Sequence, residues 1–317
     1  GQRTPYLRGN GMNIITLTLG PAFDMHCHAD KLILDHENLV YMDLCQAGGK
    51  GVNISRALVN NGTANLALLV LGQENADSFM RNLDVDGVTY EAITVPGRIR
   101  ENITIHTGNT ETRISFPGFR VEPDVLPQVE ARLLALADDE TIITMTGRVA
   151  EGMAVADVIA MLRKAAAKGA KIVVDSRSFS LQDLKDLKPW LIKPNQEEIS
   201  AYLGREISSL EQTLAEAKAL HEAGIANVMI SMGGDGALLV CDEGTFIAVP
   251  PKVEVKSTIG AGDSSIAGFS ACPADNAAEK LRWAVAYGSA ACMAEGTLPP
   301  EPADVAFIKD NIQLRTL

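Results

Sequence analysis

Residues 255–269 read VKSTIGAGDSSIAGF, in which two glycines, Gly260 and Gly262, flank one alanine and Asp263 follows directly. The small and apolar residues after Asp263 predict a helix that begins at the glycines. Small residues let a ligand approach the backbone, and the N–H groups and dipole of a helix N-terminus favour an anion. A carboxylate beside a bound phosphate costs electrostatic energy, and taking a proton from an attacking hydroxyl is a reason to place one there. Taken alone, the segment is better interpreted as a glycine-rich turn capped by an aspartate.

The composition limits the classes of protein that contain such a segment. The 317 residues are 46% hydrophobic and 21% charged, which suits a large α/β domain with or without a small appendage. A net charge of −12, without a run of lysine and arginine, disfavours nucleic acid and an anionic membrane surface as partners. No stretch approaches the roughly 20 apolar residues that cross a bilayer.

Cysteine usage and the first residues lead to two further expectations. The five cysteines are odd in number and form no C-x-x-C pair, so we expect a reducing cytoplasm rather than a disulfide framework. Residues 1–11 lack an apolar signal core and precede Met12, and we interpret them as a remnant of recombinant expression outside the fold.

Strands and helices alternate along most of the chain. Buried strands are predicted at 13–19, 66–71, 141–145, 171–175 and 227–231. Their alternation with helices predicts an α/β fold with a mostly parallel central sheet and helices on both faces.

Two segments rich in strands interrupt this alternation, and we expect them to pair as a small second sheet. The second sheet, a β lid, would comprise residues 23–44 and 92–117. The core would comprise residues 12–22, 45–91 and 118–317.

Clusters of glycines or polar residues follow the predicted strands. They lie at Asp24 and at 48–53, 146–148, 193–198, 231–236 and 257–263. Ligands bind at the carboxyl ends of the strands in such sheets, so we expect the clusters to meet at one edge. The G-x-x-x-x-G-K-[ST] motif and a G-x-G-x-x-G motif after the first strand are both absent from the sequence.

Four of these segments, in this order, resemble the ribokinase/PfkB family of sugar kinases. The similar branch is that of the phosphosugar kinases, namely 1-phosphofructokinase, tagatose-6-phosphate kinase and the minor 6-phosphofructokinase. The matching segments are TLTLGPAFD at 16–24, GGKGVN at 48–53, IKPNQEE at 192–198 and STIGAGDS at 257–264. The resemblance implies a ribokinase-like three-layer sandwich with a small β lid.

The resemblance also implies which residues carry out phosphoryl transfer. Asp263 would be the catalytic base, and the anion hole for the γ-phosphoryl group would comprise Gly260, Ala261 and Gly262. Asn195 and Glu198 match an N-x-x-E motif that acts on Mg²⁺ largely through water. The positions that match the ATP site are Lys193, Asn195, Ser231, Gly233, Gly234 and Gly236.

On the sugar side, Asp24 matches a carboxylate that grips sugar hydroxyls, and Lys50 would add positive charge near a phosphate. Arg100 matches an arginine that helps to hold the phosphate already on the substrate, a task that suits bidentate pairing. Arg113 has a counterpart mainly in members like 6-phosphofructokinase. The alternative interpretation of Arg113 is a solvated charge on an exposed ribbon. The sugar-contacting loop is matched by Gly48, Gly49 and Asn53.

Two positions depart from the family pattern. The family usually has S-G-S-L-P-P-G where this chain has TGRVAEG at 146–152. A hydroxyl remains at Thr146, but Arg148 replaces a small serine near the sugar pocket, where it would either contact a phosphate or block the usual substrate. Gly20 stands where many members carry asparagine.

The sequence therefore predicts a cytoplasmic, ATP- and Mg²⁺-dependent kinase of a phosphorylated ketohexose. Fructose 1-phosphate, giving fructose 1,6-bisphosphate, is the first choice of substrate, with tagatose 6-phosphate and fructose 6-phosphate as alternatives. The lid would exclude water, and a homodimer formed through it would bury its exposed edge.

Two other classes of protein are alternatives. His26 and His28 form an H-x-H after the first strand, as in amidohydrolase zinc sites, but the chain offers no further histidine at a convincing strand end. A non-catalytic sugar-phosphate sensor is disfavoured by Asp263, because a protein that only binds needs no base.

Overall fold

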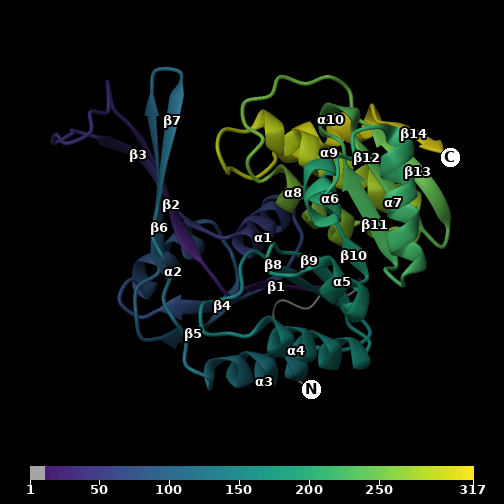
Figure 1. The fold of residues 1–317 in the computed structure, drawn as a ribbon, viewed down its shortest axis with the longest axis horizontal. Helices are drawn as coiled ribbons and strands as arrows, with labels where there is room; N and C mark the ends of the chain where they lie inside the picture. The colour runs from purple at the N-terminus through teal and green to yellow at the C-terminus, as the bar shows by residue number, and fades with distance from the viewer. Residues whose placement is uncertain (1–10) are drawn as a thin grey trace.

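The structure, a computed structural model, describes residues 11–317 of the chain (Figure 1). Except for Gly11, the segment that we interpret as an expression remnant lies outside the described residues.

A ten-stranded sheet forms the centre of the molecule. Its strands, in spatial order, are β14 (Gln313–Thr316), β13 (Gly244–Val249), β12 (Ala237–Cys241), β11 (Asn227–Ser231), β10 (Leu191–Ile192), β9 (Lys171–Asp175), β8 (Thr141–Thr146), β1 (Asn13–Thr18), β4 (Leu66–Gly72) and β5 (Tyr90–Val95). The strands from β11 to β5 run parallel, and β12, β13 and β14 add an antiparallel edge.

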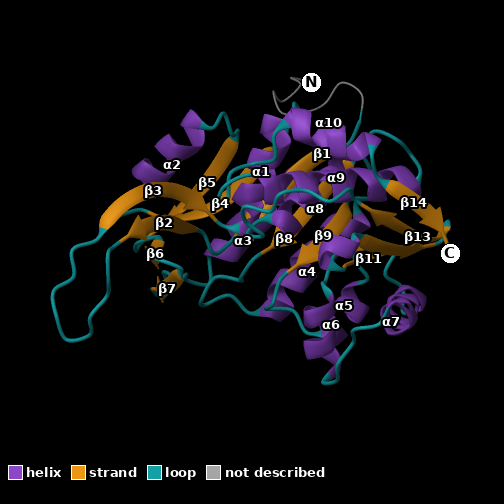
Figure 2. Cartoon of the chain, turned by 90° about the horizontal axis from the view of Figure 1, so that it is seen from above, coloured by secondary structure: helices purple, strands orange, loops and turns teal. Residues whose placement is uncertain are grey.

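Helices cover both faces of this sheet (Figures 1 and 2). The helices on one face are α3 (Val125–Leu136), α4 (Val155–Ala167), α5 (Leu181–Leu187), α6 (Gln196–Leu203) and α7 (Leu210–Glu222). Those on the other face are α1 (Lys50–Asn60), α2 (Ala76–Val85), α8 (Ala261–Ala271), α9 (Ala277–Met293) and α10 (Pro302–Asp310). Within residues 11–317, no helix has the length and apolar character needed to cross a membrane.

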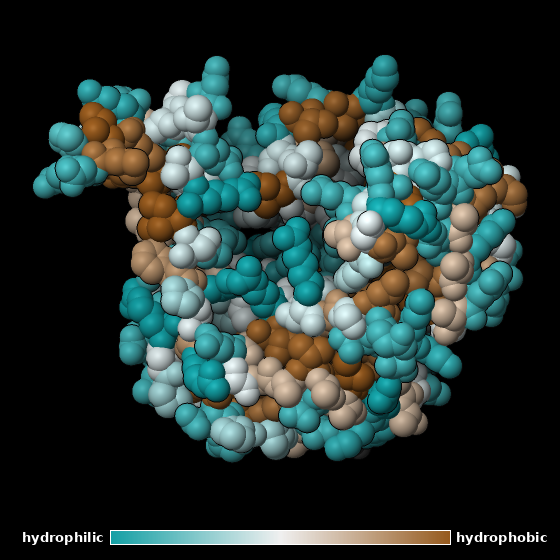
Figure 3. Space-filling model, viewed as in Figure 1, coloured by the Kyte–Doolittle hydropathy of each residue, from teal (hydrophilic) through white to brown (hydrophobic). Residues whose placement is uncertain are grey.

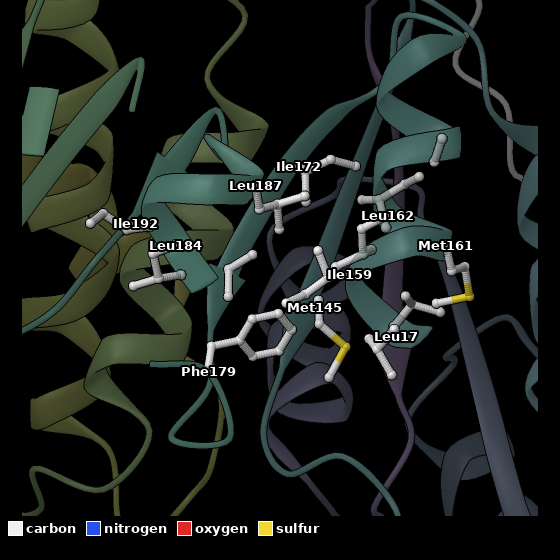
Figure 4. Close-up of a cluster of buried hydrophobic side chains, with 14 of the residues drawn as sticks. Leu17, Met145, Ile159, Met161, Leu162, Ile172, Phe179, Leu184, Leu187 and Ile192 are labelled. Atoms are coloured by element: carbon white, nitrogen blue, oxygen red, sulfur yellow. The ribbon is translucent and has the colours of Figure 1, made fainter. Parts of the chain in front are cut away.

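Burial on both faces explains why the parallel strands have continuous apolar sequences. All seven residues of β4, LALLVLG, are buried. Ile142 and Ile143 are neighbours in β8 but pack into different core clusters, because successive side chains of a strand point to opposite faces. Figure 4 shows the cluster in which Leu17 of β1 and Met145 of β8 pack against Ile159 of α4. The predicted three-layer α/β fold with a mostly parallel sheet is confirmed.

A second, four-stranded sheet projects from this core (Figure 1). Its strands, in spatial order, are β3 (Tyr41–Gly48), β2 (Ala22–His28), β6 (Arg100–Thr107) and β7 (Thr110–Ser115). The register of the parallel pair β2 and β6 places Ala22 beside Arg100 and Asp24 beside Asn102. Strands from the two predicted segments therefore pair with each other.

The second sheet differs from the expected ranges in three places. β3 continues through residues 45–48, which were expected in the core, because they pair with β2. Residues 92–95 belong to β5, which pairs with β4 in the central sheet after the crossover through α2. Residues 29–40 form a loop, in which the Asn38 side chain accepts a hydrogen bond from the Ile33 N–H and donates one to the Ile33 carbonyl. The side chain thereby takes the place of a strand partner for this backbone.

Candidate active site

A cleft of about 440 Å³ lies between the second sheet and the carboxyl edge of the central sheet. The hollow is visible on the face shown in Figure 3. Because parallel strands end at the same edge, loops far apart in the chain contribute to it. The predicted site residues that line the cleft are Asp24, Gly49, Lys50, Asn53, Arg100, Arg113, Arg148, Gly260 and Asp263.

Asp263 is the third residue of α8 and lies in its first turn. Gly260 precedes the helix with φ = 81°, a left-handed conformation that glycine adopts without strain. The Asp263 side chain is buried, and its Oδ2 accepts a hydrogen bond of 3.2 Å from Asn53 Nδ2. The helix N-terminus and its carboxylate therefore both face the cleft, as the sequence predicts.

Burial, with a smaller contribution from the neighbouring carboxylate of Asp175, raises the pKa of Asp263 to about 6, although Lys50, Asn53 and Lys193 act to lower it. A carboxyl group in this range exchanges its proton near neutral pH, as general-base catalysis requires.

Lys50 connects the start of α1 with the carboxylate of Asp175. It is the first residue of α1, and its Nζ donates a hydrogen bond of 3.1 Å to Asp175 Oδ2. Burial acts to lower the pKa of Lys50, but Asp175, Asp263 and Glu198 together raise it. The ammonium group is thus held in its charged form among three carboxylates.

The predicted ATP-site residues follow β10 and β11, which are adjacent. Lys193 is buried, and a Cβ built on Gly262 would lie 2.8 Å from its Nζ, so the ammonium group reaches the start of α8. Asn195 and Ser231 are paired by an isolated bridge between the strand ends. Gly233 and Gly234 lie in a 3₁₀ turn (Gly233–Asp235) that Gly236 ends with φ = 88°.

Asn195 and Glu198, the predicted magnesium residues, begin α6. The Asn195 Oδ1 atom caps the helix by accepting a hydrogen bond of 2.7 Å from the Glu198 N–H. The Glu198 and Asp175 carboxylates line one small cavity beside Lys193. Oxygen donors of this kind suit Mg²⁺.

On the sugar side, Asp24 lies directly over Gly48. A Cβ built on Gly48 would be 2.2 Å from Asp24 Oδ2, so Gly48 leaves room for the carboxylate although it does not itself line the cleft. Burial raises the pKa of Asp24, and the charges of His26, Arg56 and Arg100 oppose the rise. The Arg100 guanidinium donates to the carbonyl oxygens of Gly20 and Pro21 at 3.3 and 3.4 Å.

Two other predicted substrate residues, Thr146 and Arg113, have weaker connections to the cleft. Thr146 is buried at the end of β8 and is not among the residues that line the cleft. Arg113 lines the cleft on β7, but its side chain is exposed and pairs with Glu111 at 2.7 Å.

Asp175, Asn102 and Arg177 belong to the site, although the sequence analysis did not single them out. Asp175 ends a buried strand and Arg177 follows it. Both therefore lie at the carboxyl end of a strand, the signal by which the other polar clusters were found. Asn102 is two residues from Arg100 on β6, and side chains two apart in a strand share a face.

The histidines that suggested a zinc site lie on the second sheet. His28 Nδ1 is 2.7 Å from Asp43, and the His26 ring stacks on His106 with centroids 6.1 Å apart. In the part of the chain that the structure describes, no group of three histidine, cysteine or acidic residues is arranged to hold a metal ion.

Comparison with known proteins gives concordant results. The family described as pfkB family carbohydrate kinase matches residues 35–304. The 1-phosphofructokinase of Vibrio cholerae is 32% identical over 257 residues, which cover 81% of each chain. That of Rhodobacter capsulatus is 31% identical over 314 residues, covering 96% of this chain and 98% of its own. The crystal structure of phosphofructokinase-2 from Escherichia coli with substrates and products is 27% identical, with a TM-score of 0.87 and coverage of 94% and 98%.

We expect the substitution Asp263→Asn to stabilise the fold above about pH 6. Because the folded pKa lies above the ordinary value of 3.8, the stability contributed by protonated Asp263 is complete below pH 3.8 and is lost as the pH rises through about 6. The amide avoids that loss, so the free energy of unfolding should rise by at most about 3 kcal/mol. Denaturant titrations in alkaline and acidic buffer measure the difference, which should shrink in acid.

Asp157→Asn is the matched control, because Asp157 is also the third residue of its helix, α4, but is exposed. An Asp263→Asn variant that is no more stable than the native chain in alkaline buffer would contradict the expectation.

Proposed function

The chain belongs to the PfkB family of carbohydrate kinases, and we propose that it transfers the γ-phosphoryl group of ATP to a phosphorylated ketohexose, with fructose 1-phosphate as the first choice. It is a sugar kinase that uses ATP. The observation that carries the finer proposal is the convergence of Asp263, Asp24 and Arg100 on one cleft. The three supply a base, a partner for sugar hydroxyls and a cation for the substrate's own phosphate.

The chemistry follows from the placement of Asp263. Its carboxylate accepts the proton of the substrate hydroxyl while the hydroxyl oxygen forms a bond to the γ-phosphorus, and the bond from that phosphorus to the β-γ bridging oxygen of ATP breaks. The N-terminus of α8 and the ammonium group of Lys193, beside Gly262, offset the negative charge of the group in transfer.

Mg²⁺ would neutralise part of the nucleotide's phosphate charge. Of the two residues of the N-x-x-E motif, Glu198 is the better candidate to hold its water shell, because the Asn195 oxygen already caps α6. Asn195 would then act by fixing the start of the helix that carries Glu198.

The choice of fructose 1-phosphate rests on the curated relatives, which include 1-phosphofructokinases of several bacteria at 31–33% identity. Tagatose 6-phosphate and fructose 6-phosphate are the alternatives, since solved structures of similar fold include phosphofructokinase-2 with fructose-6-phosphate. The proposed location is the cytoplasm, where ATP and sugar phosphates are available.

We further propose that the second sheet is a lid and that two chains dimerise through it. The core, expected at 12–22, 45–91 and 118–317, then gains residues 92–95 of β5 and loses residues 45–48 of β3 to the lid. Thr297 Oγ1, from the loop after α9, donates to Gln46 Oε1 of β3 at 2.6 Å and joins the sheet to the core at the cleft. Beyond this contact, Leu34 and Leu39 are 94% and 73% exposed, and Tyr41 and Met42 are also exposed. Apolar side chains gather on this projecting part in Figure 3. A second copy would cover them.

A screen of ADP release over hexose monophosphates and unphosphorylated sugars tests the proposed function. Turnover should be fastest with fructose 1-phosphate and should stop when EDTA removes Mg²⁺. Turnover of unphosphorylated sugars alone would refute the phosphosugar assignment, and full activity in EDTA would refute the magnesium requirement.

We expect Asp263→Asn to lower kcat by about 10²–10⁴-fold while ATP binding persists, because the amide cannot accept the proton. In the native enzyme, kcat/KM should fall as the pH drops through about 6, where Asp263 becomes protonated. Initial rates across a pH series measure both effects, and Asp157→Asn should behave as the native chain. An Asp263→Asn variant with native kcat would rule out the assigned role.

The substitution Leu39→Asp is expected to weaken the dimer, because it places a charge in the proposed apolar contact. Sedimentation velocity over a range of concentrations measures the change. Val85→Asp is the control, since Val85 is 87% exposed at the end of α2, outside the second sheet. A monomeric native chain, or a dimer unaffected by Leu39→Asp, would count against assembly through the lid.

A further inference from the structure

Arg148 stands where two cavities meet. It lines the 440 Å³ cleft and also a neighbouring cavity of about 220 Å³, and Gly20 and Arg100 are the other residues common to both. The smaller cavity is bounded by apolar side chains, including Phe116, and by neither Lys50 nor Asp263. The two arginines therefore form the wall at which the cleft that contains Lys50 and Asp263 joins the smaller cavity.

Gly20 is adjacent to both arginines at this wall. Its carbonyl oxygen accepts the hydrogen bond from Arg100 Nη2 at 3.3 Å. A Cβ built on Gly20 would lie 3.1 Å from the Arg148 carbonyl oxygen, so a side chain at position 20 would press on the backbone of Arg148. The two positions at which the chain departs from the family pattern are thus in contact, through the backbone of residue 148.

The electrostatics of the wall favour an anion between the two guanidinium groups. Burial, and then the charge of Arg148, lower the pKa of Arg100, which shows that the two cations act on each other. Glu151 lines the smaller cavity, but its carboxylate pairs with Arg120 at 3.5 Å. Asp24 acts on Arg100 from the cleft side. A phosphate dianion offers several oxygens, enough to accept hydrogen bonds from both guanidinium groups.

We propose that Arg148 determines substrate specificity by holding, together with Arg100, the phosphate already carried by the sugar. The inference rests on the proposed function and deepens it. The substrate then lies with its reacting hydroxyl at Asp263 and its phosphate at the Arg100 and Arg148 wall, which selects ketohexoses phosphorylated at the end remote from that hydroxyl. Arg148 acts here as a phosphate ligand and not as an obstruction.

The test compares Arg148→Ser, Arg148→Lys and the native enzyme, with Arg120→Ala as the matched control. Arg120 is a neighbouring exposed arginine that pairs with Glu151 without lining either cavity. Isothermal titration calorimetry with fructose 1-phosphate and with fructose measures binding directly, and initial rates give KM and kcat. Because Arg148 is exposed, its replacement should leave the fold intact, which thermal denaturation checks.

We expect Arg148→Ser to raise the Kd and KM for fructose 1-phosphate by about 10–100-fold, the loss of one charged hydrogen-bonding partner. The binding of fructose and the KM for ATP should stay unchanged, and Arg148→Lys should recover part of the affinity. The double variant Arg100→Ala with Arg148→Ser should lose less than the product of the single losses, because both residues serve one phosphate.

If Arg148→Ser binds fructose 1-phosphate with native affinity, the inference is wrong but the proposed function stands. Tighter binding by this variant would identify Arg148 as an obstruction. If the native enzyme neither binds nor phosphorylates any sugar phosphate, the proposed function fails, and the inference fails with it.

Discussion

A buried carboxylate at the N-terminus of a helix is the constraint around which this molecule is arranged. Asp263 is removed from water in the first turn of α8, where burial raises its pKa to about 6 and makes the charged form costly. The surrounding groups keep that cost limited. Asn53 donates a hydrogen bond to it, and Lys50 and Lys193 bring positive charge from two different loops. Each compensating group is itself at a loop or helix start that the central sheet places at one edge.

The same edge requires close approaches that only small residues permit. Gly51 packs α1 against β1 so closely that a Cβ would lie 2.2 Å from Thr18 Oγ1. Gly48 makes room for the Asp24 carboxylate, and Gly262 for the Lys193 ammonium group. These glycines allow the carboxylates and cations of the site to come within interaction distance, so the glycine-rich segments set the geometry as well as the backbone conformation.

Much of the candidate site could be predicted because its residues follow strands. Glycines or polar side chains directly after apolar strands indicate a shared edge, and that rule placed Asp24, Lys50 and Asp263 together correctly. It could not identify Asp175 as a partner of Lys50, because a strand-ending aspartate looks the same whether it contacts solvent or a lysine 125 residues away. The same rule could not predict the boundary of the second sheet. Residues 92–95 pair with β4 after a crossover, and their own composition does not reveal that pairing.

The sequence by itself determined the α/β class and the family resemblance, and it singled out Asp263 as the proposed base, because periodicity, glycine spacing and ordered motifs are local properties of the chain. Only the tertiary structure decided how Arg148 and Gly20 are related. They are far apart in sequence, and their contact depends on the parallel pairing of β1 with β8, which brings the loops after both strands to one place. Pairing between distant strands is a property of the whole sheet, and the chemistry of the cleft depends on it.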